Sequence, residues 1–308
     1  MTGSIGRFAP SPTGLLHLGN ARSALLGWLW ARRNGGSFLV RVEDLDPDRS
    51  KERFVDACFA DLRWLGLDWD GEVLRQSARG EAYRAALQTL KQKGLAYPCS
   101  CSRAEVARAA SAPHAGEDGP IYPGTCRVAG PKPGKPLAWR FHVEPGVTEF
   151  EDGVHGKTSQ DVSAQVGDFV IQRADGVASY QLAVVVDDAA QSVTHVLRGD
   201  DLLGSTPRQL LLQRALGFAA PQYAHVPLLL GPHGQRLAKR EGHWTVDGLR
   251  AAGATAEAVV GFLAGSCGLS DGAPLTARAL VNEFSLSRLQ KQASPTSAEA
   301  LAALTSRR

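Results

Sequence analysis

The chain has 308 residues, of which 44% are hydrophobic and 21% are charged, and a formal net charge of +3. This composition is ordinary for a globular enzyme, and the mild positive charge fits one local surface for nucleic acid better than a protein that coats DNA. The N-terminus shows no apolar h-region, and the longest apolar runs are too short to span a bilayer. With five cysteines, an odd count that suits a reducing compartment, these features predict a cytoplasmic protein.

The first hundred residues begin with a strand–helix–strand unit. Residues 4–8 and 37–42 have the pattern of short buried strands, and residues 20–33 between them have helical apolar spacing. This order predicts a parallel α/β sheet. Two amphipathic helices are expected next, at residues 51–65 and 78–94.

Near residue 98 the chain becomes rich in proline, glycine and clustered cysteines, and strand patterns return later. Strands are expected at residues 168–172, 179–186, 193–198 and 226–230, with a helix at 207–216. A sheet that is interrupted and resumed predicts one Rossmann-like α/β domain that carries an insert. The expected units are residues 1–97 and 179–238 for the domain, 98–178 for the insert and 239–308 for a basic loop followed by a helical segment.

A candidate phosphate-binding segment joins the first strand to the first helix. It reads RFAPSPTGLLHLGN and ends at Asn20. His17 and Asn20 lie at a helix N-terminus, where backbone N–H groups and the helix dipole attract phosphate, and Gly14 and Gly19 allow close backbone approach. On its own this segment could be an ordinary turn with a structural histidine.

A second candidate, GPHGQRLAKR, is a glycine-rich loop that carries Arg236, Lys239 and Arg240 after a strand. Taken alone it could be a solvated basic turn, and neither segment has the glycine spacing of a Walker A loop. Because ligands of open α/β sheets bind at the carboxyl ends of strands, where the two halves meet, the pair predicts a triphosphate site.

A metal site is suggested by Cys99, Cys101 and Cys126, with Tyr122 between them. Three thiolates and one oxygen ligand suit tetrahedral Zn²⁺. The spacing leaves two alternatives open: free thiols, or a site in which His114 replaces Tyr122. Cys58 and Cys267 are expected to pack as small apolar residues.

These motifs resemble the class I aminoacyl-tRNA synthetases. His17-Leu-Gly-Asn20 is similar to the HIGH signature, and Arg236-Leu-Ala-Lys-Arg240 to the KMSKS loop, with Ala238 where the family usually has serine. The segments RFAPSPTGLLHLGNAR, RVEDLDPDRS, RQSARGEAYRAAL and VLRGDDLLGSTPRQ resemble the glutamyl-tRNA synthetase family to about residue 245.

The resemblance implies sites for ATP, which is used with Mg²⁺, and for L-glutamate. The implied ATP site is His17, Gly19, Asn20, Arg236 and Lys239, of which His17 and Lys239 are catalytic. The implied glutamate site is Arg7, Phe8, Ala9, Pro10, Ser11, Glu43, Tyr180 and Arg198. Its two arginines offer forked donors for carboxylates, and its glutamate offers an anion for the ammonium group.

Within this family, the Cys-x-Cys…Tyr-x₃-Cys pattern resembles the glutamyl-queuosine branch, which implies one structural Zn²⁺ on Cys99, Cys101, Tyr122 and Cys126. Fewer than seventy residues follow Lys239, whereas an anticodon-binding domain would need ~100–200. The implied activity is transfer of glutamate to queuosine in the anticodon stem-loop of tRNA(Asp), by an enzyme expected to be a monomer. Two alternatives stay open: a short glutamyl-tRNA synthetase that charges a tRNA 3′ end, and a catalytically silent tRNA-binding paralogue.

Overall fold

The computed structural model describes residues 3–109, 120–231, 234 and 244–306. Its main sheet has the strand order β3-β2-β1-β9-β10-β6-β7, in which every pair is parallel except the β6–β7 hairpin at one edge. The strands are β1 Ile5–Phe8, β2 Ser37–Val42, β3 Leu74–Arg75, β6 Val147–Asp152, β7 Gly156–Asp161, β9 His195–Gly199 and β10 Gln222–Val226. The prediction of a parallel α/β sheet is confirmed.

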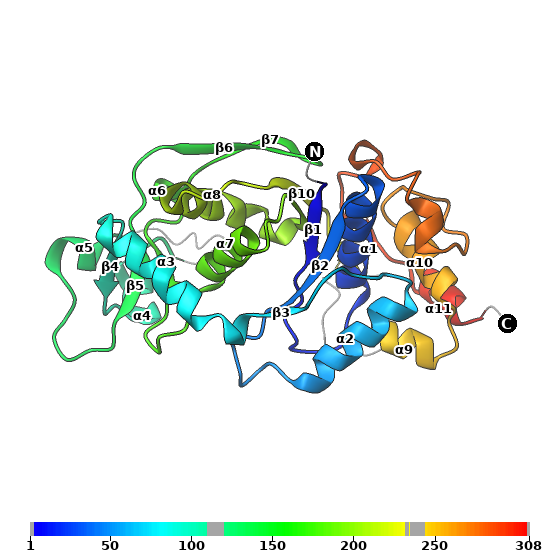
Figure 1. Cartoon of the computed structure of the whole chain (residues 1–308), viewed down its shortest axis with the longest axis horizontal. Coiled ribbons are helices and arrows are strands. Elements are labelled where there is room, and N and C mark those ends of the chain that lie inside the picture. Colours follow the sequence, from blue (N-terminus) through cyan, green and yellow to red (C-terminus); the bar gives the residue numbers. More distant parts are fainter. Residues whose placement is uncertain (1–2, 110–119, 232–233, 235–243, 307–308) are drawn as a thin grey trace.

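Helices cover the main sheet on both faces (Figure 1). Helix α1 (Leu18–Arg33) follows β1 and packs on one face together with α10 (Ala256–Gly265). Helices α3 (Gly80–Gln92), α7 (Tyr180–Ala190) and α8 (Thr206–Leu216) form a second apolar core on the other side. The carboxyl ends of the central strands therefore lie between two layers of helices.

A smaller antiparallel sheet, β4-β5-β8, lies at the end of the molecule away from α1 (Figure 1). Its strands are β4 Ala96–Cys99, β5 Ala138–Phe141 and β8 Phe169–Gln172, and the short helices beside it are α4 Arg103–Ala109, α5 Thr125–Ala129 and α6 Val162–Gln165. The cysteine-rich segment belongs to this sheet, so its chemistry is separate from that of the central strands.

The remaining elements surround α1. They are α2 Glu52–Trp64, α9 Val246–Ala251, α11 Ala298–Ser306, β11 Leu229–Leu230 and β12 Ser294–Pro295, and the last two pair in parallel. Short 3₁₀ helices lie at Gln76–Ala78, Asp200–Ser205, Ala277–Leu280 and Leu286–Arg288. Within the described ranges, no helix has both the length and the apolarity needed to cross a bilayer.

Two of the expected strands are wrong in type or position. Residues 179–186 belong to helix α7, whose N-terminus is capped by the Ser179 side chain, an acceptor for the Leu182 N–H at 3.4 Å. The run LAVVV is buried on every side of this helix, so it shows no amphipathic period and resembles a buried strand. The strand expected at 226–230 instead ends at Val226, because Pro227 has no N–H to donate to the ladder.

Candidate active site

A cavity of about 460 Å³ lies at the carboxyl ends of β1, β9 and β10. Its walls include every residue of the expected glutamate site: Arg7, Phe8, Ala9, Pro10, Ser11, Glu43, Tyr180 and Arg198. His17, Gly19 and Asn20 line the same cavity. The structure thus brings together residues that are up to about 190 positions apart in the sequence.

His17 is the N-cap of α1, and its Nδ1 accepts a hydrogen bond from the Asn20 N–H at 3.3 Å. A Cβ added to Gly19 would lie 3.2 Å from that nitrogen, so glycine leaves the imidazole room against the helix. The ring therefore lies at the N-terminus of a 16-residue helix, where anionic oxygens are favoured.

Described residues on both sides of the basic loop contact the cavity or this helix N-terminus. Leu229, before the loop in sequence, lines the cavity, and Thr245, after it, forms an antiparallel bridge with His17. The Val246 N–H also donates to the Leu16 carbonyl at 2.9 Å. The predicted ATP ligands Arg236 and Lys239, together with Ala238, lie outside the described residues.

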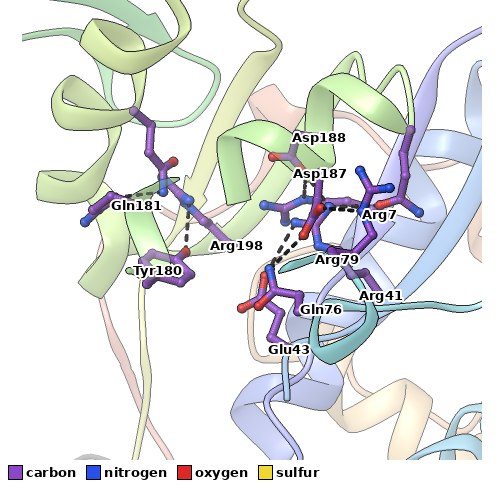
Figure 2. Close-up of polar contacts among 12 residues, drawn as sticks. Arg7, Arg41, Glu43, Gln76, Arg79, Tyr180, Gln181, Asp187, Asp188 and Arg198 are labelled. Atoms are coloured by element: carbon purple, nitrogen blue, oxygen red, sulfur yellow. Dashed lines mark hydrogen bonds and ion pairs between the residues drawn. The ribbon is translucent and has the colours of Figure 1, made fainter. Parts of the chain in front are cut away.

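A fully buried ion network holds Arg7 on one wall of the cavity (Figure 2). Asp188, from α7, accepts from Arg7 Nε at 3.3 Å and from Arg41 Nη1 at 2.7 Å. Burial opposes ionisation of Asp188, but Arg41 and Arg7 together hold its pKa below the ordinary value. Arg41 also donates to Glu43 at 3.4 Å, whereas burial raises the pKa of Glu43.

Helix α7 carries a second acid, Asp187, at the position just before Asp188. Asp187 accepts from Tyr83 Oη at 2.7 Å, from Gln76 Nε2 at 3.0 Å and from Arg79 Nε at 3.1 Å. These bonds attach α3 and the turn before it to α7, beside the network around Arg7 (Figure 2). Sequence reasoning missed both aspartates because it expected a strand that ended at residue 186, whereas helix α7 continues through them.

Arg198 lies on the opposite wall, at the end of β9 (Figure 2). It donates from Nη1 to Tyr180 Oη at 3.3 Å, from Nη2 to Thr206 Oγ1 at 2.9 Å and from Nε to His225 Nε2 at 3.0 Å. Among the lining residues, Arg7 and Arg198 therefore offer two fixed guanidinium groups and Glu43 offers a carboxylate, and together they can bind a small molecule carrying two carboxylates and an ammonium group.

The three clustered cysteines meet in the smaller sheet. The ligand sulfur atoms of Cys99, Cys101 and Cys126 all lie within 4.8 Å of one another. Cys101 and Cys126 sulfurs are 3.4 Å apart, and Tyr122 Oη lies 3.4 Å from Cys99 Sγ and 3.8 Å from Cys101 Sγ. Ligands of one tetrahedral Zn²⁺ lie roughly 3.4–3.8 Å from each other, so these donors fit zinc.

The thiols of the cluster differ in acidity. Burial disfavours the Cys126 thiolate, but hydrogen bonds from Ser100, Tyr122 and Cys101 lower its pKa to about 7, whereas burial raises the pKa of Cys101 to about 11. Arg140 Nε donates to Cys99 Sγ at 3.3 Å, which offsets the excess negative charge that three thiolates would give. The alternative ligand His114 lies outside the described residues. Cys58 and Cys267 are buried elsewhere, as expected for packing residues.

Comparison with known proteins agrees with this arrangement. The family described as tRNA synthetases class I (E and Q), catalytic domain, matches residues 5–302. A glutamyl-Q tRNA(Asp) synthetase of Symbiobacterium thermophilum is 51% identical over 97% of this chain and 98% of that protein. One of Geobacter sulfurreducens is 55% identical over 77% of this chain and 76% of its own.

A solved structure shows the same fold. It is a glutamate tRNA ligase from Elizabethkingia meningosepticum in complex with its amino acid, with a TM-score of 0.84 at 27% identity, covering 99% of this chain and 69% of that chain. The chain therefore belongs to the class I tRNA synthetases for glutamate and glutamine, and it shares about half of its residues with relatives named glutamyl-Q tRNA(Asp) synthetase.

Proposed function

We propose that the chain uses ATP to activate L-glutamate and transfers the glutamyl group to queuosine at the wobble position of tRNA(Asp). One observation carries the activation step: Arg7, Glu43 and Arg198 line one cavity that also opens on the N-terminus of α1. The family membership and the names of the relatives support the acceptor. A cytoplasmic monomer, and the division into a Rossmann-like domain, an insert and a C-terminal segment, belong to the same proposal.

The reaction has two steps. In the first, an oxygen of the glutamate α-carboxylate forms a bond to the α-phosphorus of ATP, and the bond to pyrophosphate breaks. In the second, a tRNA hydroxyl attacks the carbonyl carbon of the glutamyl-adenylate, loses its proton and displaces AMP. The protein contributes mainly by positioning these groups and by stabilising negative charge on the phosphates.

The cavity residues divide these tasks. Arg7 and Arg198 would each bind a carboxylate group, and Glu43 would accept the ammonium group, whose positive charge favours the ionised form of Glu43. His17, at the helix N-terminus, would donate from Nε2 to a phosphate oxygen, because its Nδ1 accepts from the Asn20 N–H. Mg²⁺ would accompany the ATP phosphates.

Lys239 would supply a second positive charge to the phosphates. Thr245, which follows this loop in the sequence, forms a bridge with His17. Replacing Lys239 with alanine is expected to slow glutamate-dependent ATP–pyrophosphate exchange by ~10²–10³, the usual loss for one preorganised donor. Exchange at the wild-type rate in this variant would remove Lys239 from the mechanism.

A structural Zn²⁺ completes the proposal, held by Cys99, Cys101, Tyr122 and Cys126. Their mutual distances and the basic neighbour Arg140 support it. Because these residues lie in the smaller sheet, the ion would stabilise that sheet and the segment packed on it and would take no part in glutamate activation.

The acceptor can be identified with four tRNA samples. Labelled glutamate and ATP are incubated with tRNA(Asp) that contains or lacks queuosine, each either intact or shortened by its terminal adenosine. We expect label on both queuosine-containing samples and on neither of the others. Label that requires the terminal adenosine would identify a 3′-end glutamyl-tRNA synthetase instead, and absence of label and of adenylate would identify a silent paralogue.

A further inference from the structure

Behind Arg198, away from the cavity, lies a pair of buried polar residues that none of the sites above includes. His225 is on β10 and Asp152 is the last residue of β6, and both side chains are 0% exposed. His225 Nδ1 and Asp152 Oδ2 are 2.6 Å apart, and His225 Nε2 is 3.0 Å from Arg198 Nε. The three groups form one continuous hydrogen-bonded chain that ends at the cavity wall.

The donors around Asp152 fix the direction of these hydrogen bonds. Its Oδ1 accepts from the backbone N–H groups of Val154 at 3.0 Å, His155 at 2.9 Å and His225 at 3.2 Å. A carboxylate with so many donors stays ionised, and the bonds from His225, His155 and Val154 lower its pKa despite burial. The imidazole must therefore carry its proton on Nδ1 and present a lone pair on Nε2 to Arg198 Nε, with Thr206 Oγ1 also 3.1 Å from that nitrogen.

The arginine is then held on three sides. Its Nε donates to His225, and its Nη2 faces Thr206 Oγ1 at 2.9 Å and the Leu202 carbonyl at 3.4 Å. Its Nη1 donates to Tyr180 Oη, and Tyr180 also lines the cavity. A guanidinium with fewer partners could rotate about its terminal torsions and lose this orientation.

The carboxylate of this hydrogen-bonded row, Asp152, comes from the β6–β7 hairpin, which lies at the edge of the main sheet (Figure 1). Asp152 is the residue of β6 that pairs with Tyr223 of β10, two positions before His225. The hairpin therefore contributes to the cavity indirectly, by supplying the anion behind the histidine.

We propose that Asp152 and His225 are positioning residues that fix the orientation of Arg198 and thereby set the affinity of the cavity for a substrate carboxylate. This inference rests on the proposed binding of glutamate. A purely structural role would make the same pair important for folding only, so the test separates binding from stability.

Two substitutions of His225 separate the two hydrogen bonds. Glutamine can place an oxygen near the position of Nε2 and still accept from Arg198, whereas asparagine can donate to Asp152 but does not reach Arg198. By calorimetry, His225→Asn should weaken glutamate binding by roughly 10- to 100-fold, the effect of losing one hydrogen bond to a charged group, and His225→Gln should restore most of it. In pyrophosphate exchange the same loss should appear in KM for glutamate, with little change in kcat or in KM for ATP.

Tyr223→Phe is the matched control. The substitution keeps the ring, which lies 5.4 Å from the Arg198 guanidinium, and removes only the hydroxyl that accepts from Gln213 Nε2 at 3.0 Å, so it should lower stability without changing glutamate affinity. Equal glutamate affinities in His225→Asn, His225→Gln and wild type would overturn the inference, as would losses in both His225 variants that merely follow their unfolding free energies. If the wild-type protein binds glutamate but catalyses no exchange, the proposed function fails, and the glutamate affinities of the His225 variants still decide the positioning role. If the wild-type protein binds no glutamate, the proposed function and the positioning role both fail.

A measurement on the unchanged protein covers the case in which His225→Asn does not fold. Long-range ¹H–¹⁵N spectra should show His225 as the Nδ1–H tautomer at neutral pH, and glutamate should shift its Nε2 resonance through Arg198. The opposite tautomer, or an Nε2 resonance that glutamate leaves unmoved, would contradict the positioning role.

Discussion

Asp188 forms ion pairs with two buried arginines at once. Its Oδ1 lies 3.3 Å from Arg7 Nε and 2.7 Å from Arg41 Nη1, and the three side chains are at most 4% exposed. Removing one member of such a group leaves uncompensated charge in the interior, which costs far more than the loss of an exposed ion pair. The residue therefore links the stability of the sheet to the geometry of the cavity.

Replacing Asp188 with alanine is expected to lower the free energy of unfolding by about 3–5 kcal/mol and to weaken glutamate binding through Arg7. Urea unfolding and calorimetry measure the two effects. The matched control is Asp175→Ala, which removes the exposed partner of Arg173 at 2.5 Å and should cost about 1 kcal/mol or less. Similar losses in the two variants would contradict the buried-network interpretation.

The buried imidazole of His225 should make the free energy of unfolding depend on pH. Burial, reinforced by Arg198 and opposed by Asp152, lowers the pKa of His225 to about 4, whereas the unfolded value is 6.5. Between these values the unfolded chain binds a proton that the folded chain does not, so the free energy of unfolding falls as the pH falls, by up to about 1.4 kcal/mol per pH unit. Urea unfolding at pH 7, 6 and 5 should show a steeper loss in wild type than in His225→Gln. Parallel curves for the two proteins would contradict this account.

Among the elements, α7 shows where sequence reasoning fails. The first strand, helix and second strand could be predicted from their apolar periods and from the glycine turn between them. In α7 the apolar residues surround the helix, so local pattern could not distinguish it from a buried strand. The cap at Ser179 was the available signal, because serine at a helix N-cap is strongly favoured.

The smaller sheet offers a test of the metal ligands. If Tyr122 Oη binds Zn²⁺, Tyr122→Phe removes one of four ligands and leaves a three-cysteine site. The zinc affinity should then fall roughly tenfold or more. Tyr97→Phe is the control, since that hydroxyl lies in the same sheet but donates to Asp168 at 2.6 Å. Zinc content by mass spectrometry and a chelator competition give the stoichiometry and the affinity. Unchanged zinc affinity in Tyr122→Phe would show that Tyr122 is not a ligand and would favour His114 as the fourth ligand or a site of three cysteines alone.

For the whole molecule, the sequence predicted the residues that line the cavity but not the residues that hold them. Arg7, Ser11, Glu43, Tyr180 and Arg198 could be found because they lie in segments that resemble a known family. Their partners depend on which strands become neighbours: β1 and β9 are adjacent although about 190 residues separate them, and β6 joins the main sheet from the segment that was expected to be an insert. Such pairings are set by tertiary packing and leave no local pattern.

We propose that this one cavity binds glutamate and ATP together and joins them. The proposal can be examined by glutamate-dependent ATP–pyrophosphate exchange, measured on the wild-type protein without tRNA. We expect exchange with L-glutamate and much slower exchange with L-glutamine or L-aspartate, because Arg7 and Arg198 are fixed at separate positions for two carboxylates. A folded protein that catalyses no exchange with L-glutamate, or that exchanges equally well with all three amino acids, would contradict it.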